Sequence, residues 1–314
     1  MSERIAHQGE GIEGARVRWI NGGQRLHLQH GPIELLVALD GSKSAISSAY
    51  ARAIDAFPSM LPSLVSELTL LRRQIQPAAP VSPTGRIARQ MFKAARVYAN
   101  EQFITPMAAV AGSVADELLA VILSGQPITR ASVNNGGDIA LYLRDGEVFN
   151  IGICDSLRTG RIASTVCVTA SDRIGGIATS GWQGRSHSLG IADAVTVLAH
   201  SAAAADCAAT IIANAIDLPA SPKISRAPAN ELFPDSDLGS MPVTVDVDTL
   251  TPQERMSALS TGQAVATKLL KLGHIQSAFL SLQGQGVVVK PDESLPVTPT
   301  TTPPMPLCQS LSLR

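Results

Sequence analysis

The sequence predicts an α+β fold, α/β layered, in which mixed sheets pack with helices around a central cleft. Alternating apolar residues predict strands and hairpins, and apolar residues at helical spacing predict helices. Three segments rich in Gly, Asn and Ser interrupt these elements, and we expect them to line a buried polar cleft. The chain has 314 residues, 45% of them hydrophobic, which is enough for a sizeable core. We predict one domain over residues 1–290 and a disordered Pro- and Thr-rich tail over residues 291–314.

The first part of the chain predicts hairpins followed by two helices. Alternating apolar residues over 15–40 surround Asn21-Gly22-Gly23, a hairpin signal, and His30-Gly31-Pro32 marks a second turn. Apolar residues then recur at helical spacing over 44–57 and 60–74.

The middle of the chain predicts two more helices and then a run of strands. A Pro-rich connection at 76–84 leads to a helix from Gly85 to Asn100. The next helix begins at Pro106, with Thr105 as its N-cap, because proline is tolerated at the first helical position. The predicted strands lie near 130–134, 138–143, 147–153 and 162–169.

A polar stretch over 171–191 is Gly- and Ser-rich and predicts a loop. It is followed by a predicted strand over 192–198 and an Ala-rich helix over 201–215. Residues 218–250 contain many Pro, Asp and Ser residues, so we expect a long irregular excursion there.

The last predicted elements are a helix and a hairpin. Thr251-Pro252-Gln253-Glu254 has the form of a capping box, so a helix should begin there and end near Leu272. The segments 275–282 and 286–290 predict a final hairpin.

Composition narrows the class of protein. The formal net charge is −1 and aromatic residues make up 4%, which argues against a nucleic-acid or membrane-surface binder. The sequence has no stretch of about 18 uninterrupted apolar residues, so we predict no membrane span. The polar N-terminus does not resemble a signal peptide, and we therefore expect a cytoplasmic protein. No C-x-x-C pair indicates a zinc site, and we expect reduced thiols at all four cysteines: Cys154, Cys167, Cys207 and Cys308.

The first polar segment is the helix start at 105–116. Its small residues would let a flat ligand or another backbone come close, and its first-turn N–H groups would receive an anion. We assign Thr105 and Met107 to ligand binding. Tight helix packing is an equally good explanation of the small face, which consists of Ala108, Ala111, Gly112 and Ala115.

The second polar segment joins two apolar strands. It contains Asn134, Asn135, Gly136, Gly137 and Asp138. Glycine lets a ligand approach the main chain, and asparagine offers donors and acceptors, so this set suits a heteroaromatic ring. An ordinary hairpin turn is the alternative.

The third polar segment, 178–190, offers successive loop N–H groups that would form an anion nest. His187 is the general acid or base candidate because its side chain titrates near neutrality, although a loop histidine is often incidental. Ser180 is a second catalytic candidate. The binding candidates here are Thr179, Gly181, Ser186 and Ser188, with Arg185 beside them.

The fourth polar segment is helical. Asp206 and Thr210 lie four residues apart and so share a face, where a carboxylate and a hydroxyl suit Mg²⁺. The alternative is a solvated Asp206 and a Thr210 hydroxyl that contacts the preceding turn. Asp193 is a further carboxylate, at a strand start, and a third catalytic candidate.

Taken in order, four pieces of the sequence resemble the ApbE-like superfamily, and in particular its branch of short proteins without an assigned function. The pieces are TPMAAVAGSVADEL, VNNGGDIAL, IATSG and ADCAATIIAN. The resemblance covers roughly residues 16–290. It implies the ApbE-like fold, a flavin-binding turn at Asn134–Asp138 and a Mg²⁺ site at Asp206 and Thr210.

The resemblance implies binding of FAD or FMN, with Mg²⁺-assisted FMN transfer or FAD pyrophosphatase activity, in which His187 or Asp193 would deprotonate an acceptor hydroxyl. The chain departs from the transferase pattern in two places. Ala111 stands where the family has a lysine, and an H-I-I-D-P motif is absent, with His187 only roughly in its place. A small-ring hydrolase or isomerase and a non-catalytic cofactor carrier remain alternatives. We expect a small-molecule partner, and a homodimer is left open.

Overall fold

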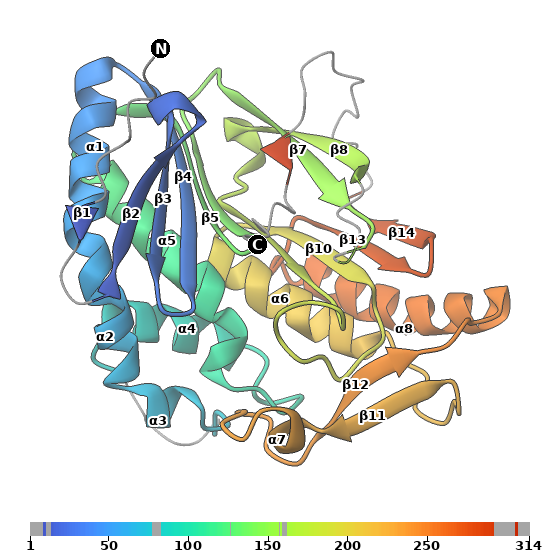
Figure 1. Cartoon of the computed structure of the whole chain (residues 1–314). Coiled ribbons are helices and arrows are strands. Elements are labelled where there is room, and N and C mark those ends of the chain that lie inside the picture. The colour runs from blue at the N-terminus through green and yellow to red at the C-terminus, as the bar shows by residue number, and fades with distance from the viewer. Residues whose placement is uncertain are drawn as a thin grey trace, which may run out of the picture.

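The computed structural model describes most of the chain (Figure 1). The described residues are 9–10, 14–76, 83–125, 127–156, 158, 162–291 and 305–306. Most of the predicted tail and most of the Pro-rich connection at 76–84 lie outside them. The domain boundaries and the disorder of the tail therefore stay predictions.

Ten strands form one sheet in the order β1-β2-β3-β4-β5-β6-β9-β10-β13-β14, and every pairing in it is antiparallel. The strands are β1 (Gly9–Glu10), β2 (Arg16–Ile20), β3 (Arg25–His30), β4 (Ile33–Gly41), β5 (Ile128–Asn135), β6 (Asp138–Leu143), β9 (Gly176–Ser180), β10 (Ala194–Ala199), β13 (Ser277–Leu282) and β14 (Gln285–Val289). The predicted hairpins at both ends of the chain are confirmed. Short connections favour antiparallel neighbours, as at Gly31-Pro32 between β3 and β4.

Two small sheets accompany the large one. β15 (Met305–Pro306), β7 (Val148–Cys154) and β8 (Ile162–Thr169) form a mixed sheet, because β15 pairs with β7 in parallel and β8 pairs with β7 antiparallel. β11 (Ile224–Pro228) and β12 (Pro242–Val247) form an antiparallel pair. With its helices, the protein is an α+β fold, as predicted.

Helices cover one face of the large sheet. α1 packs on β4, α5 on β5 and β6, α6 on β9 and β10, and α8 on β13 and β14, while each of these helices touches the next, so they form a continuous layer (Figure 1). The helices are α1 (Lys43–Ala56), α2 (Met60–Val65), α3 (Leu68–Leu71), α4 (Arg86–Arg96), α5 (Val110–Leu123), α6 (Ala202–Ala215), α7 (Ala229–Leu232) and α8 (Pro252–Lys271). A 3₁₀ turn, η4 (Pro106–Ala109), precedes α5.

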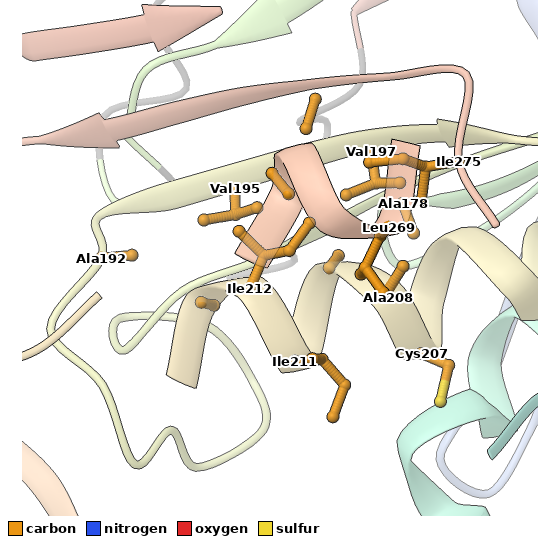
Figure 2. Close-up of a cluster of buried hydrophobic side chains, with 14 of the residues drawn as sticks. Ala178, Ala192, Val195, Val197, Cys207, Ala208, Ile211, Ile212, Leu269 and Ile275 are labelled. Atoms are coloured by element: carbon orange, nitrogen blue, oxygen red, sulfur yellow. The ribbon is translucent and has the colours of Figure 1, made fainter. Parts of the chain in front are cut away.

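The core lies between the sheet and this helix layer. Under its C-terminal half, side chains of α6 meet those of β9, β10 and α8 (Figure 2). A second cluster fills the space between β3–β6 and the helices α1, α4 and α5. A third cluster lies between the sheet and the β7–β8 pair. These packed apolar side chains therefore fix the positions of the strands and helices that carry the candidate site residues.

Among the residues that the structure describes, one helical segment is long and apolar enough to cross a membrane, Pro106–Leu123. In this fold 56% of it is buried, and α5 packs against sheet and helices, so it is a core helix of the domain. The cytoplasmic location and the homodimer stay untested expectations.

Three expectations for secondary structure are wrong in detail. The helix predicted over 60–74 is divided into α2 and α3, and the Glu67 carboxylate at the break accepts the N–H groups of Thr84 and Gly85 at 2.8 and 2.7 Å. The predicted loop over 171–191 contains β9, a central strand that β6 and β10 hold on either side. The irregular excursion over 218–250 contains α7 and the β11–β12 pair.

The predicted capping box at the start of α8 is confirmed. The Thr251 hydroxyl accepts the N–H of Glu254 at 3.3 Å, and the Glu254 carboxylate accepts the N–H of Thr251 at 2.6 Å. We expect Thr251→Ala to destabilise the protein by about 1 kcal/mol, because an N-terminal N–H loses its acceptor. Urea unfolding measures the loss, and Thr251→Ser should retain wild-type stability because the hydroxyl remains. Equal losses in both variants would contradict the capping role.

Candidate functional site

Helix α6 presents one polar stripe to the candidate site. Asp206, Thr210 and Asn214 are four residues apart along the helix, so they lie on one face, and each is half-buried. The other faces of the helix carry buried residues: Ala208 and Ile212 point toward the strands, and Cys207 and Ile211 point to a different side (Figure 2). Because those apolar residues pack into the core, the helix cannot rotate, and the polar stripe is fixed in direction.

The start of α5 packs directly against the start of α6. A Cβ atom at Gly112 would overlap the carbonyl group of Ala202 and lie 2.7 Å from the backbone nitrogen of Ala203. The Asp116 carboxylate accepts the N–H groups of Ala202 and Ala203 at 3.0 and 2.9 Å, so α5 caps α6. Of the two explanations for the small-residue face, helix packing therefore applies at Gly112. The same approach lets the Gly112 N–H donate to Asp206 Oδ2 at 3.0 Å.

Two carboxylates lie close together at this junction. Burial raises the pKa of Asp206 well above its usual value, and the charge of Asp138 raises it further, while N–H groups of Gly112 and Ala111 lower it. Burial also raises the pKa of Asp138 to about 7, against the lowering effect of the N–H of Thr179. Besides burial, the neighbouring carboxylates of Asp138 and Asp116 raise the pKa of Asp206, so its surroundings favour the neutral form of this side chain.

The turn between β5 and β6 holds Asp138 in place. Gly136 and Gly137 have φ values of +67° and +118°, a left-handed pair that a two-residue hairpin requires. The Gly137 N–H donates to Asn134 Oδ1 at 2.8 Å, and Asn135 Nδ2 donates to the carbonyl of Ala111 at 3.0 Å. The segment is thus an ordinary hairpin turn, and it is also tied to the start of α5 beside Asp206.

The loop that follows β9, residues 181–193, approaches the same turn. Arg185 Nη1 lies 3.3 Å from the position that a Cβ atom would take at Gly136, so the exposed Arg185 side chain lies against the turn. Farther along, Ser188 Oγ and Asn214 Oδ1 are 3.2 Å apart in a hydrogen bond that ties the loop to the end of the polar stripe. Ser188 is buried, so its hydroxyl serves the protein's own structure rather than a ligand.

His187 and Ser186 stand between these two anchors. Ser186 is exposed and His187 is half-buried. The His187 ring contacts the ring of Phe233, with 5.3 Å between centroids. Its Nε2 atom is buried and has no hydrogen-bond partner within the described residues.

The predicted site residues at the end of β9 mainly make contacts with neighbouring strands of the sheet. Thr179 and Thr196 share a hydrogen bond between their hydroxyls at 2.9 Å, and the Thr179 N–H donates to Asp138. A Cβ atom at Gly181 would lie 2.5 Å from the carbonyl oxygen of Asp193, so the close strand approach requires glycine. Ser180 is half-buried at the last position of the strand.

Asp193 makes bonds that give it a structural role. Its two oxygens accept the backbone N–H of Gln283 at 2.6 Å and the indole N–H of Trp182 at 3.3 Å. Burial raises its pKa, and these two donors lower it. The carboxylate therefore joins the loop to the β13–β14 turn, which does not support the expectation that it acts as a catalytic base.

Thr105 is the helix cap that the sequence predicts. Its hydroxyl oxygen accepts the N–H of Met107 at 3.2 Å, and the hydroxyl donates to Asp237 at 2.5 Å. Thr105 is buried and Met107 is half-buried. The first of these residues thus connects η4 to the excursion rather than presenting a free hydroxyl.

The structure brings some of the predicted site residues together and leaves others apart. Asp206 accepts the Gly112 N–H at the start of α5 and is influenced by the charge of Asp138, and Arg185 lies over the adjoining turn. Sequence reasoning missed Asn214 and Asp116. The helical period could have predicted Asn214, since it follows Thr210 by four residues. The capping role of Asp116 could not be predicted in this way, because it depends on a contact between two helices far apart in the chain.

A Mg²⁺ ion would fit this junction only with few protein ligands. Within the described part of the chain, no three His, Cys, Asp or Glu side chains form a metal-binding group. Mg²⁺ commonly takes one or two carboxylates and completes its shell with water and substrate phosphate. The half-buried pair Asp206 and Asp138, with the Thr210 hydroxyl one helical turn from Asp206, matches that donor set.

The fold and the candidate site together define a class of protein. It is an α+β protein with two carboxylates between the β5–β6 hairpin and the adjoining starts of α5 and α6. The chain belongs to the family described as AbpE bacteria, whose family model matches residues 17–288.

Relatives of the chain carry names without a stated activity. A UPF0280 protein of Methanopyrus kandleri is 34% identical over 174 residues, which span 55% of this chain and 66% of that protein. A UPF0280 protein of Methanocaldococcus jannaschii is 38% identical over 113 residues, 36% of this chain and 45% of that protein. The matches thus span less than two thirds of the length of these relatives.

Two solved structures are similar at low identity. The ApbE protein of Thermotoga maritima is 16% identical with a TM-score of 0.35, and the match covers 81% of this chain and 77% of that one. The flavinyl transferase ApbE of Pseudomonas stutzeri, in its apo form, is 13% identical with a TM-score of 0.40, and the match covers 89% and 96%. Scores this low do not place individual site residues.

Proposed function

We propose that the protein binds a flavin nucleotide, FAD or FMN, at the junction of α5, α6 and the β5–β6 turn, with Mg²⁺ at the phosphate. The observation that carries this proposal is the half-buried Asp206 carboxylate beside Asp138. Two such carboxylates repel each other, and a divalent cation between them and a phosphate would remove that cost. Membership of the ApbE-type family supports the flavin as ligand.

The residues around the pair suit the two parts of such a ligand. Arg185 lies over the turn, where its guanidinium would pair with a phosphate oxygen. Asn134 uses its Oδ1 for Gly137, which leaves its amide N–H groups as donors for a ring edge. The glycines of the turn let a flat ring approach the main chain.

The reaction class that follows is cleavage or transfer at a phosphate. When bound, Mg²⁺ would neutralise charge that develops on the phosphate oxygens. His187 would accept or donate the proton, since its Nε2 is buried and lacks a partner among the described residues. FMN transfer and FAD pyrophosphatase activity are the two forms of this reaction that we propose.

Flavin titration tests the proposal. We expect FMN and FAD to bind with micromolar or better affinity and to bind more tightly with Mg²⁺ present. Riboflavin lacks a phosphate, so its binding should not respond to Mg²⁺. Isothermal titration or flavin fluorescence measures each affinity. No binding of either nucleotide in the presence of Mg²⁺ would refute the proposed function.

A further inference from the structure

The large sheet ends at β14 with an edge that no strand of the described residues covers. β14 pairs with β13 in an unbroken antiparallel register, so alternate N–H and C=O groups on its other side point away from the sheet. Soluble proteins usually protect such an edge with a charged residue, a proline, a bulge or a very short strand. None of these interrupts Gln285–Val289, whereas β1, at the opposite end of the sheet, has two residues and includes Glu10.

Helix α8 continues this uncharged surface. Residues 256–267 contain no Asp, Glu, Lys or Arg, although a surface helix usually carries charges on its exposed face. Within α8, one stripe recurs at alternating spacings of four and three residues and consists of Met256, Ser260, Gln263, Thr267 and Leu270. Met256 is 61% exposed, and Ser260 and Gln263 are also exposed. Because the centres of protein interfaces are depleted of charged residues, this surface has the composition of an interface.

The stripe points in the same direction as the free edge of β14. On the side of α8 that faces α6, the Thr261 hydroxyl donates to the carbonyl of Ala215 at 2.5 Å. Gln263, in the middle of the stripe, lies about 160° around the helix from Thr261, so the stripe points away from α6. In Figure 1, α8 and β14 lie at the same end of the molecule. The strand edge and the stripe therefore belong to one face of the protein.

The middle of the stripe lies level with the middle of β14. A Cβ atom at Gly262 would lie 3.2 Å from Leu280 Cδ2, and Leu280 pairs with Val287, the central residue of β14. A two-fold axis beside Val287 would therefore relate two copies of the strand and two copies of the stripe at once.

The spacing of the layers agrees with such an axis. α8 packs on both β13 and β14, so its axis runs between them. Paired strands are about 4.8 Å apart, which places the two-fold axis about 2.4 Å outside β14 and about 5 Å from the axis of α8. Two copies of α8 would then lie about 10 Å apart, and packed helices are separated by about 8–10 Å.

We propose that two copies of this chain form a dimer in which the β14 strands pair antiparallel and the α8 stripes pack against each other. The strand pairing is self-complementary. With Val287 opposite its own copy, Val288, which is 60% exposed, lies opposite Gly286 of the second copy, where no side chain stands. The ring of Phe279 lies beside that glycine, since a Cβ atom at Gly286 would be 3.2 Å from it, so Val288 gains an apolar neighbour.

The helix contact is self-complementary as well. In an antiparallel pair of stripes, Met256 lies opposite Leu270 of the second copy, Ser260 lies opposite Thr267, and Gln263 lies opposite itself. No charge on either element meets a like charge, and none offers an anchor to a charged partner. A second copy therefore fits this face, and its association does not depend on the proposed function.

Sedimentation equilibrium of the full chain from low to high micromolar concentration tests the dimer. We expect wild type to have twice the chain mass of 32.8 kDa. Val288→Lys should weaken dimerisation by about tenfold or more, because a lysine on an edge strand opposes strand pairing. Val245→Lys is the matched control, because Val245 is also an exposed valine on a strand, in β12, and its replacement should leave the dimer intact.

A charge exchange at Gln263 tests the helix contact. Gln263→Glu and Gln263→Lys each place two like charges opposite each other across the two-fold axis, so each variant alone should be monomeric where wild type is dimeric. An equimolar mixture of the two variants should dimerise again, because unlike charges then face each other. Ser257→Glu, at an exposed position of α8 outside the stripe, should dimerise like wild type.

Three results would overturn the proposal. Wild type that is monomeric at every concentration would refute the dimer and would leave the β14 edge to a strand of another protein. Dimers that persist in Val288→Lys and in both Gln263 variants would place the contact elsewhere. A mixture of the Gln263 variants that stays monomeric would refute the antiparallel helix contact. Gln263 is exposed, and circular dichroism verifies each fold, so the mixture decides the question even where Val288→Lys does not fold.

Discussion

Replacement of Gly112 by alanine is expected to destabilise the protein by about 3 kcal/mol or to prevent folding. A Cβ atom there would overlap the carbonyl of Ala202, at the start of α6. The obstacle is backbone, and the bonds from Ala202 and Ala203 to Asp116 hold it in place. By helix propensity alone the substitution should stabilise α5 by about 1 kcal/mol, so a large loss identifies the steric contact as the dominant effect.

Urea unfolding provides the measurement, and Gly273→Ala provides the control. Gly273 has a φ of +73° and no atom within 4 Å of its Cβ position, so alanine there meets only backbone strain. That strain should cost about 1 kcal/mol. A Gly112→Ala variant as stable as wild type would show that α5 and α6 can separate, and it would remove the geometric basis for the bond between Gly112 and Asp206.

Local signals in the sequence predicted much of this fold. The Asn-Gly-Gly turn, the Thr105 cap and the Thr251 capping box each depend on residues within a few positions of one another, and the structure has all three elements. The central strand β9 was missed because its short Gly-Ile-Ala-Thr-Ser sequence carries little alternation. Its strand conformation depends on hydrogen bonds to β6 and β10, which no local pattern contains.

The same distinction applies to the candidate site. The helical period predicted that Asp206 and Thr210 share a face, and α6 places them there. The proximity of Asp138 to Asp206 depends on how the β5–β6 turn meets α5 and α6, so the sequence placed both residues in candidate segments without pairing them. Asp193 was selected as a carboxylate at a strand start, but its bonds to Trp182 and Gln283 depend on distant elements.

Asp206→Asn is expected to affect stability and ligand binding in opposite directions. The folded-state pKa of Asp206 is raised above its usual value by burial and by Asp138. A group of this kind contributes stability that is fully present below its unfolded pKa and is lost as pH rises through the folded pKa. At pH 7 without metal, the neutral asparagine should therefore make the protein at least as stable as wild type, and the difference should shrink as the pH falls toward 4.

In the presence of ligand the order should reverse. Saturation of wild type with FMN and Mg²⁺ at about 100 times the Kd should stabilise it by about 2.7 kcal/mol, and Asp206→Asn should lose most of that gain because Mg²⁺ favours a charged carboxylate. Thr210→Val should lose less, since a hydroxyl is a neutral ligand. Asp145→Asn, at an exposed turn residue, is the control and should match wild type. Thermal unfolding with and without Mg²⁺ measures all four proteins. An Asp206→Asn variant that is less stable than wild type without metal, yet gains fully from Mg²⁺ and FMN, would assign Asp206 to holding α5 against α6 through Gly112 and would leave the metal role without support.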